Sequence, residues 1–200
     1  VALRELYNEG MLRDISAFAE LNGWKKVLPQ VIWDNISVDN KVVAVPLTLH
    51  GSNWIYGSKL ILDEVGIKMP SNWDDFLAAA SKIDAAGYIP LAIGGQPWQE
   101  RNLFLSVLLG SAGRDIYQRV IVEHDLVAMG GEEMVNAFTL FRRLQAFSDE
   151  NSPGRSWDDT TRMLIENKAA FQIMGDWAKG EFKQAEKVAG KDYLCSLSPG

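Results

Sequence analysis

Residues 169–177, which run AAFQIMGDW, decide the fold. The first six are almost all apolar, and a short apolar run bounded by a turn predicts a buried strand over Ala169–Met174. Gly175 and Asp176 then predict the start of a helix that continues through Ala185. A chain in which such strands alternate with helices is typical of a layered α/β fold.

Capping residues and apolar positions at helical spacing predict the other helices. Asn72 or Ser71 caps one helix and Ser156 caps another, and each is followed by aspartates that favour the positive end of the helix dipole. The predicted helices are Lys59–Val65 before Gly66, residues 73–86 with Trp73, Phe76, Leu77, Ala80 and Ile83 on one stripe, Arg101–Leu109, a helix with Met134, Ala137, Phe138, Phe141 and Leu144 on one stripe, and the helix after Ser156.

The first 40 residues predict short helices, and an alternating segment follows them. Val43, Val45, Leu47 and Leu49 share one face at period two, which predicts a strand over Val42–His50. Because proline cannot donate to a strand ladder, Pro46 favours an edge or crossing segment. Further strands are predicted at Asn53–Tyr56, at Tyr88–Ile93 and within residues 192–200.

The composition is that of an ordinary globular protein and excludes several classes of function. Of the 200 residues, 47% are hydrophobic and 23% charged, and the formal net charge is −6. Nucleic acids and anionic membranes attract clustered cations, so the lack of a basic block excludes both as expected partners. The single cysteine, Cys195, excludes an internal disulfide, and we expect it to be a packed core thiol rather than a nucleophile.

The sequence lacks the motifs of catalysis and cofactor binding. His50 and His124 are far apart, and neither belongs to an H-E-x-x-H segment that would bind zinc. No G-x-S-x-G, G-x-x-x-x-G-K or G-x-G-x-x-G motif is present. Gly94 and Gly95 lack the other residues of a phosphate-binding loop. We therefore expect no catalytic residue, no metal and no cofactor.

Seven tryptophans are the unusual feature of the chain. Trp98, Trp157 and Trp177 each lie at an element boundary beside amides or carboxylates. This combination favours a sugar site, because an indole covers the C–H face of a pyranose while the sugar hydroxyls need polar partners. The other four are expected in the core, and they are Trp24, Trp33, Trp54 and Trp73.

Five segments, in this order and spacing, carry a family resemblance. They are Val45–Trp54, Lys59–Ile67, Asn72–Phe76, Pro90–Glu100 and Lys168–Phe182. On these segments the chain resembles the extracellular solute-binding proteins of bacterial ABC sugar importers, the maltose-binding-protein superfamily. Within that superfamily it is most similar to the glucose/mannose-binding branch.

The resemblance implies a periplasmic-binding-protein type II-like fold, helix-rich with a small mixed sheet, in which two α/β lobes are joined by hinge segments. Residues 1–44 would be the C-terminal helical part of lobe 1, and residues 45–197 the major part of lobe 2. The chain would cross between lobes near residues 45–56 and 193–199. Because it begins inside a helical pattern, we expect it to be a fragment covering about half of the two-lobe protein.

The resemblance also implies a site and a function. Trp177 and Trp157 would stack on the sugar, and Trp98 would face the cleft. The partners of the sugar hydroxyls would be His50, Asn53, Gln96 and Asp176. The implied function is non-catalytic: the protein captures a glucose-like monosaccharide between its lobes and delivers it to the membrane permease of an ABC importer. It would do so in the periplasm or from a lipid-anchored extracellular position.

Two other classes of function stay open. Tryptophans beside carboxylates also form glycosidase sites, and Asp158, Asp176 and Glu181 are the candidate carboxylates of a hydrolase. A lobe without its partner would expose an apolar face, which predicts dimerisation or exchange of elements between copies of the chain.

Overall fold

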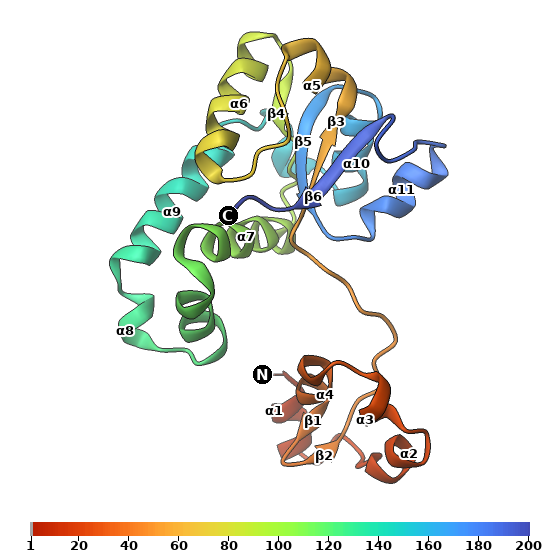
Figure 1. The fold of residues 1–200 in the computed structure, drawn as a ribbon. Coiled ribbons are helices and arrows are strands. Elements are labelled where there is room, and N and C mark those ends of the chain that lie inside the picture. Colours follow the sequence, from red (N-terminus) through yellow and green to blue (C-terminus); the bar gives the residue numbers. More distant parts are fainter. Residues whose placement is uncertain (1) are drawn as a thin grey trace. The chain divides into compact units, whose positions relative to one another are not determined.

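The computed structural model describes residues 2–200, and the chain forms two compact units (Figure 1). The first unit ends at Leu49, and the second comprises His50–Gly200. The assignment of residues 1–44 and 45–197 to two lobes stays a prediction.

The first unit consists of short helices and a small hairpin. Ala19, Ile36 and Val42 form its buried centre, and half-buried aromatic rings of Trp24 and Trp33 pack against them. The hairpin turn is formed by two residues of positive φ, 49° and 63°, which an Asp-Asn pair tolerates well. The elements are α1 (Ala2–Asn8), α2 (Ser16–Leu21), α3 (Trp24–Val27), α4 (Gln30–Ile36), β1 (Ser37–Val38) and β2 (Lys41–Val42).

A mixed sheet of four strands organises the second unit. The strands are β3 (Trp54–Ser58), β4 (Ile89–Leu91), β5 (Ala169–Met174) and β6 (Tyr193–Leu197), in the order β4-β5-β3-β6. β5 runs parallel to β4 and antiparallel to β3, which is itself antiparallel to β6. Every residue of β5 is buried, so the apolar run that predicted this strand follows from its central position (Figure 1).

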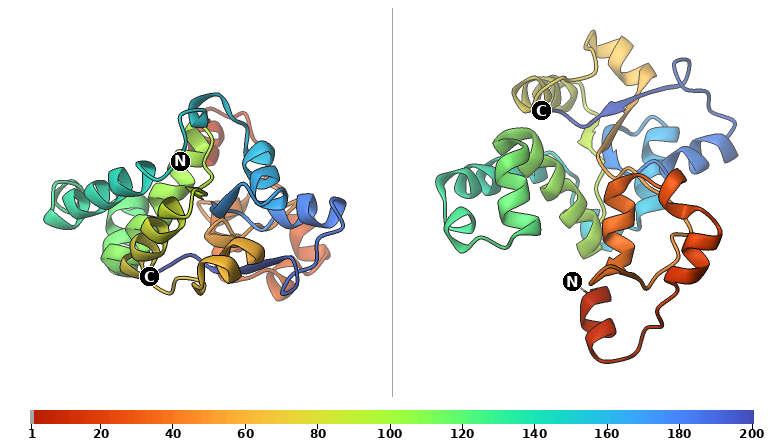
Figure 2. Two further views of the ribbon diagram at one scale, coloured as in Figure 1. Left: turned by 90° about the horizontal axis from the view of Figure 1, so that it is seen from above. Right: turned by 60° about the horizontal axis from the view of Figure 1, so that its bottom comes forward.

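Helices cover both faces of this sheet. Phe171 and Ile173 of β5 face a core formed with α5, α6, α7 and α9, whereas Met174 faces α10 and α11. Figure 2 shows α7 and α9 side by side and apart from α10 and α11. These helices are α5 (Lys59–Val65), α6 (Trp73–Ala85), α7 (Pro97–Tyr117), the π-helical turn η1 (Gln118–Val122), α8 (Leu126–Met129), α9 (Glu132–Gln145), the 3-10 turn η2 (Ser152–Gly154), α10 (Trp157–Ile165) and α11 (Ala178–Gln184).

The predicted helix caps are confirmed. The Asn72 side chain accepts a hydrogen bond from the Asp75 N–H at 2.8 Å, and the Ser156 hydroxyl accepts one from the Asp159 N–H at 3.4 Å. Gly66 ends α5 in the left-handed conformation, where φ is 73°. Trp73 is buried in the core as predicted.

The predicted strand over Val42–His50 is wrong, because β2 ends at Val42 and residues 43–53 form no helix or strand. Alternation predicts a strand only where a neighbouring strand pairs with it, and Pro46 lacks the donor for a ladder. Leu47, expected on a buried face, is 90% exposed.

Other boundaries and burials also differ from expectation. α7 begins at Pro97 and runs to Tyr117, with a break at Gly113 where φ is 80°. The helix expected from Gly175 begins at Ala178, after a turn. Cys195 is half-buried on the edge strand β6, where it packs beside the core under α10 and α11 rather than inside it.

The central position of β5 gives a stability prediction. Phe171 is fully buried, and its ring centre lies 5.2 Å from that of Phe76. We expect Phe171→Ala to lower the free energy of unfolding by about 3–5 kcal/mol in urea denaturation. The matched control is Phe138→Ala on α9, where the ring is 52% exposed. An equal loss in both variants would contradict the assignment of the core.

Candidate functional site

One edge of the sheet in the second unit brings together loops that are distant in sequence. Trp54, the first residue of β3, lies opposite Met174, the last residue of β5, and opposite Leu197, the last residue of β6. β4 is parallel to β5, so its carboxyl end lies at the same edge. The segments around residues 50–53, 94–98 and 175–177 therefore leave the sheet together.

The turn after β5 holds the start of the second unit. Oδ1 of Asp176 lies 2.7 Å from Nδ1 of His50, and Oδ2 accepts a hydrogen bond from the Gly51 N–H at 3.3 Å. The Asp176 N–H donates to the Gly51 carbonyl at 2.9 Å. These contacts join residues that are more than 120 positions apart.

The Trp177 indole is the centre of this edge. The His50 ring is perpendicular to it at a centre-to-centre distance of 5.3 Å, and the Trp98 ring lies 6.0 Å away at 57°. A Cβ on Gly175 would come within 2.0 Å of the Trp177 ring, so a glycine is needed there for close approach. Trp98 is 39% exposed and therefore accessible to a ligand.

Gln96 and Trp98 are held at the start of α7 by a buried glutamine. The Gln99 side chain accepts a hydrogen bond from the Gly94 N–H at 3.1 Å and donates to the Gln96 side chain at 2.8 Å. Three residues later, the buried Asn102 donates to the Ser52 carbonyl at 2.9 Å. This helix face thus fixes both the 94–98 loop and the segment that contains Asn53.

Trp157 is the first residue of α10, and it is anchored through its backbone. Nε2 of the buried Gln172 donates to the Trp157 carbonyl at 3.3 Å and to the Thr160 hydroxyl at 2.6 Å. The half-buried rings of Trp157, Trp177 and Trp54 pack against the same apolar cluster. Both Trp157 and Trp177 are therefore half-buried rather than sealed in the interior, and the meeting of their two rings at one sugar stays a prediction.

Gly94 and Gly95 serve close packing in this structure. A Cβ on Gly94 would lie 2.3 Å from the Arg155 carbonyl, and one on Gly95 would lie 2.2 Å from the Pro153 carbonyl. Two hydrogen bonds of 2.6 Å join the Arg155 guanidinium to Asp149. The backbone of the loop after β4 therefore packs closely against the backbone of the segment before Trp157.

Charges at this edge favour an ionised Asp176. Burial alone would raise the pKa of the Asp176 carboxyl, but hydrogen bonds from His50 and Gly51 outweigh it and hold the pKa below its usual value. The positive charge of Lys179 acts in the same direction. The residue before Asp176 is also held by a hydrogen bond, since the buried Tyr56 donates its phenolic hydrogen to the Gly175 carbonyl at 3.1 Å. Burial raises the pKa of the Tyr56 phenol.

Several residues of this edge were missed by sequence reasoning. Trp54, expected in the core, is half-buried, and the Lys179 ammonium lies 4.0 Å from its ring centre and covers that face. Gln99, Asn102 and Gln172 are buried polar residues whose partners are loop carbonyls, amides and hydroxyls. A polar residue within an apolar strand, as at Gln172, is the one signal that could have indicated such a role.

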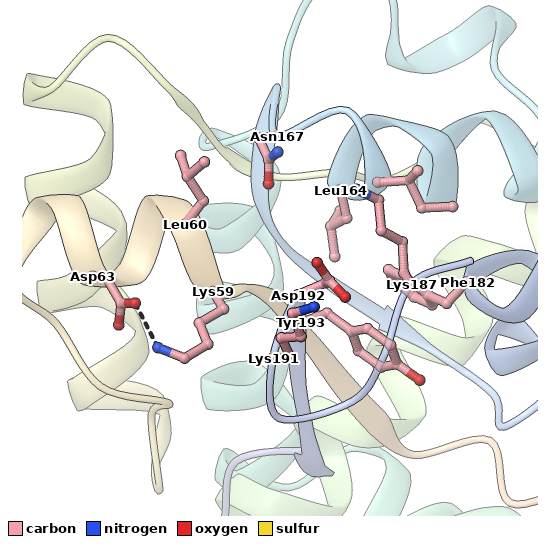
Figure 3. Close-up of a pocket in the computed structure, with 11 residues that line it drawn as sticks. Lys59, Leu60, Asp63, Leu164, Asn167, Phe182, Lys187, Lys191, Asp192 and Tyr193 are labelled. Carbon is pink, nitrogen blue, oxygen red and sulfur yellow. Dashed lines mark hydrogen bonds and ion pairs between the residues drawn. The ribbon is translucent and has the colours of Figure 1, made fainter. Parts of the chain in front are cut away.

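A cavity of about 240 Å³ lies at the opposite edge of the sheet, where β3 ends and β6 begins (Figure 3). Lys59, Asn167 and Tyr193 line it, and Lys59 pairs with Asp63. None of the predicted site residues lines this cavity.

Within residues 2–200 no group of three or more side chains is arranged as a metal site, and no helix is long and apolar enough to cross a membrane.

The comparisons with known proteins agree on one family. A family model described as bacterial extracellular solute-binding protein matches residues 1–194. A probable sugar-binding periplasmic protein of Rhizobium meliloti (strain 1021) is 40% identical over 192 residues, which are 96% of this chain and 46% of the relative. The chain thus spans about half the length of the curated relatives it matches.

Solved structures show the same fold. A chitin oligosaccharide binding protein matches with a TM-score of 0.79 and 20% identity, over 98% of this chain and 48% of that one. A solute-binding protein of Thermotoga lettingae bound with α-D-tagatose matches with a TM-score of 0.76 and 17% identity, over 98% and 51%. This likeness confirms the predicted helix-rich α/β fold with a small mixed sheet.

The contact between Gly175 and Trp177 is testable. We expect Gly175→Ala to displace the indole, to shift its N–H signal in NMR spectra and to lower the free energy of unfolding by about 1–3 kcal/mol. Gly180→Ala is the control, because a Cβ at that position of α11 meets no atom within 4 Å. It should leave the Trp177 signal in place and stabilise the helix by about 0.5–1 kcal/mol. An unchanged indole signal in both variants would contradict the packing.

The pair of Asp149 and Arg155 predicts a pH dependence. Hydrogen bonds from Arg155 hold the pKa of Asp149 below its usual value. The stability that Asp149 contributes is therefore complete above the unfolded pKa of about 3.9, and it is lost as pH falls through the lower folded pKa. We expect Asp149→Asn to cost about 1.5–3 kcal/mol at neutral pH, and the difference from the wild type to shrink in acid.

The control for this pair is Asp63→Asn, which breaks an exposed pair on α5. Exposed pairs at this spacing contribute about 0.3–0.5 kcal/mol, so this variant should behave almost as the wild type does. Urea denaturation across the acidic range measures both variants. A constant difference at all pH values would show that the Asp149 charge is not responsible.

Proposed function

Because the chain belongs to the family of bacterial extracellular solute-binding proteins, we propose that it acts as a receptor that captures a sugar and delivers it to the membrane permease of an ABC importer. The observation that carries this proposal is the assembly of His50, Trp98, Asp176 and Trp177 at one sheet edge. Curated relatives named probable sugar-binding periplasmic proteins support it, and they favour a periplasmic location. The lipid-anchored extracellular position stays a prediction.

The proposed site combines flat apolar surfaces with polar groups. The indoles of Trp98, Trp157 and Trp177 cover the C–H faces of the sugar, and each such contact contributes about 0.5–1.5 kcal/mol beyond the area it buries, if values for aromatic pairs apply. Sugar hydroxyls both donate and accept hydrogen bonds, so they need directional partners. The proposed partners are His50, Asn53, Gln96 and Asp176.

We further propose that the ligand is a glucose-like monosaccharide. The resemblance to the glucose/mannose-binding branch supports this choice. The family resemblance implies that the complete protein holds this ligand between its two lobes, and residues 45–197 would supply most of one of them. Sugar contacts favour the closed arrangement by no more than the difference in affinity between closed and open states.

The homologues favour a receptor over a hydrolase. A glycosidase pairs a general acid whose pKa is raised with a second carboxylate that stays ionised, so the lowered pKa of Asp176 argues only against the role of general acid. Asp158, another candidate carboxylate, accepts a hydrogen bond from the Ser156 hydroxyl at the start of α10. The homologues are solute-binding proteins rather than enzymes. Dimerisation or exchange of elements by this chain stays a prediction.

Calorimetry with the complete product of the gene tests the proposal. We expect one of D-glucose, D-mannose or D-galactose to bind, and Trp177→Ala to weaken that binding by about tenfold, which is 1.4 kcal/mol. Binding of maltose alone would contradict the choice of a monosaccharide. Phe138→Ala is the control, because its ring lies on α9 outside the site. Failure of all four sugars to bind, or turnover of nitrophenyl glycosides, would overturn the proposed function.

A further inference from the structure

The Asp176 carboxylate has both of its oxygens engaged with the segment that opens the second unit. Oδ1 contacts Nδ1 of His50 at 2.7 Å, and Oδ2 accepts from the Gly51 N–H at 3.3 Å. The Asp176 N–H returns a hydrogen bond to the Gly51 carbonyl at 2.9 Å. Asp176 thus makes three polar contacts with two consecutive residues, His50 and Gly51.

These contacts determine the tautomer of the histidine. An ionised carboxylate only accepts hydrogen bonds, so the proton of a neutral His50 ring must lie on Nδ1. Nε2 then carries a lone pair and can accept a hydrogen bond from a hydroxyl group. The His50 side chain is 45% exposed, so a ligand can reach the ring.

The orientation of the His50 ring is fixed as well. The His50 and Trp177 rings are perpendicular, with their centres 5.3 Å apart, and the Trp177 ring lies close to Gly175, where a Cβ would come within 2.0 Å of it. The Asp176 side chain thus contacts the His50 ring, and the next residue in the chain, Trp177, contacts the same ring.

We propose that Asp176 is a positioning residue, which holds His50 against Trp177 in the Nδ1–H tautomer so that Nε2 accepts a hydrogen bond from a ligand hydroxyl. This inference rests on the proposed sugar site and deepens it: it assigns the direct hydrogen bond to His50 and an indirect role to Asp176. A carboxylate has about four acceptor positions, so a direct contact from Asp176 to the sugar is the alternative that the test must separate.

The first experiment needs no ligand. In ¹⁵N NMR spectra of the imidazole rings at mildly alkaline pH, we expect His50 to show protonated Nδ1 and unprotonated Nε2. Asp176→Ala should move the ring toward the Nε2–H form that free histidine side chains prefer. Asp176→Asn keeps a carbonyl acceptor and should retain the Nδ1–H form. His124 serves as the internal reference, and Asp63→Ala at the opposite sheet edge as the control.

The second experiment is a double-mutant cycle with D-glucose, or with the sugar that binds in the panel above, in the complete gene product. We expect His50→Ala and Asp176→Ala each to weaken binding by roughly tenfold, and the double variant to lie within about twofold of His50→Ala. Asp176→Asn keeps an acceptor for the His50 Nδ1–H, so it should weaken binding less than Asp176→Ala does, whereas a carboxylate that touched the sugar directly would lose as much affinity on either change.

The outcomes separate this inference from the proposed function. Losses that multiply to about a hundredfold in the double variant, or a His50 tautomer that Asp176→Ala leaves unchanged, would overturn the positioning role. If no sugar binds, the proposed function is wrong, and the NMR experiment alone decides whether Asp176 fixes the His50 ring. If Asp176→Ala does not fold, Asp176→Leu, which removes the acceptor but keeps a side chain of similar size, completes the cycle with His50→Ala.

Discussion

The pairing of β5 with strands on both sides is the constraint on which the rest of the second unit depends. β5 is buried along its whole length, parallel to β4 and antiparallel to β3. This arrangement sends the end of β5, the end of β4 and the start of β3 to one edge. A shift of one residue in the register would turn Phe171 and Ile173 away from the core and carry Asp176 away from His50.

Buried polar side chains then fix the loops at that edge. Gln99 joins Gly94 to Gln96, Asn102 holds the Ser52 carbonyl, and Gln172 holds the start of α10. A buried polar group without partners is costly, so these side chains favour one arrangement of the loops over all others. A site that is ordered before the ligand arrives loses less conformational entropy on binding.

The elements predicted from the sequence alone are those that local rules determine. The cap at Asn72 and the strand Ala169–Met174 depend on neighbouring residues, and both are present. The strand predicted over Val42–His50 is absent because its alternation has no partner strand, which a single sequence does not reveal. Trp54 is half-buried, and its ring is covered by Lys179, which is distant in sequence. The binding roles of the candidate site residues stay predictions.

The arrangement of Trp98 and Trp177 has an optical consequence. Two indoles whose centres lie 6.0 Å apart and whose planes are tilted by 57° are close enough for their electronic transitions to couple. Coupled transitions of this kind split into bands of opposite sign in circular dichroism. A guest molecule that separates or reorients the rings would change that couplet, so the protein carries a label-free optical signal for occupancy in its own side chains.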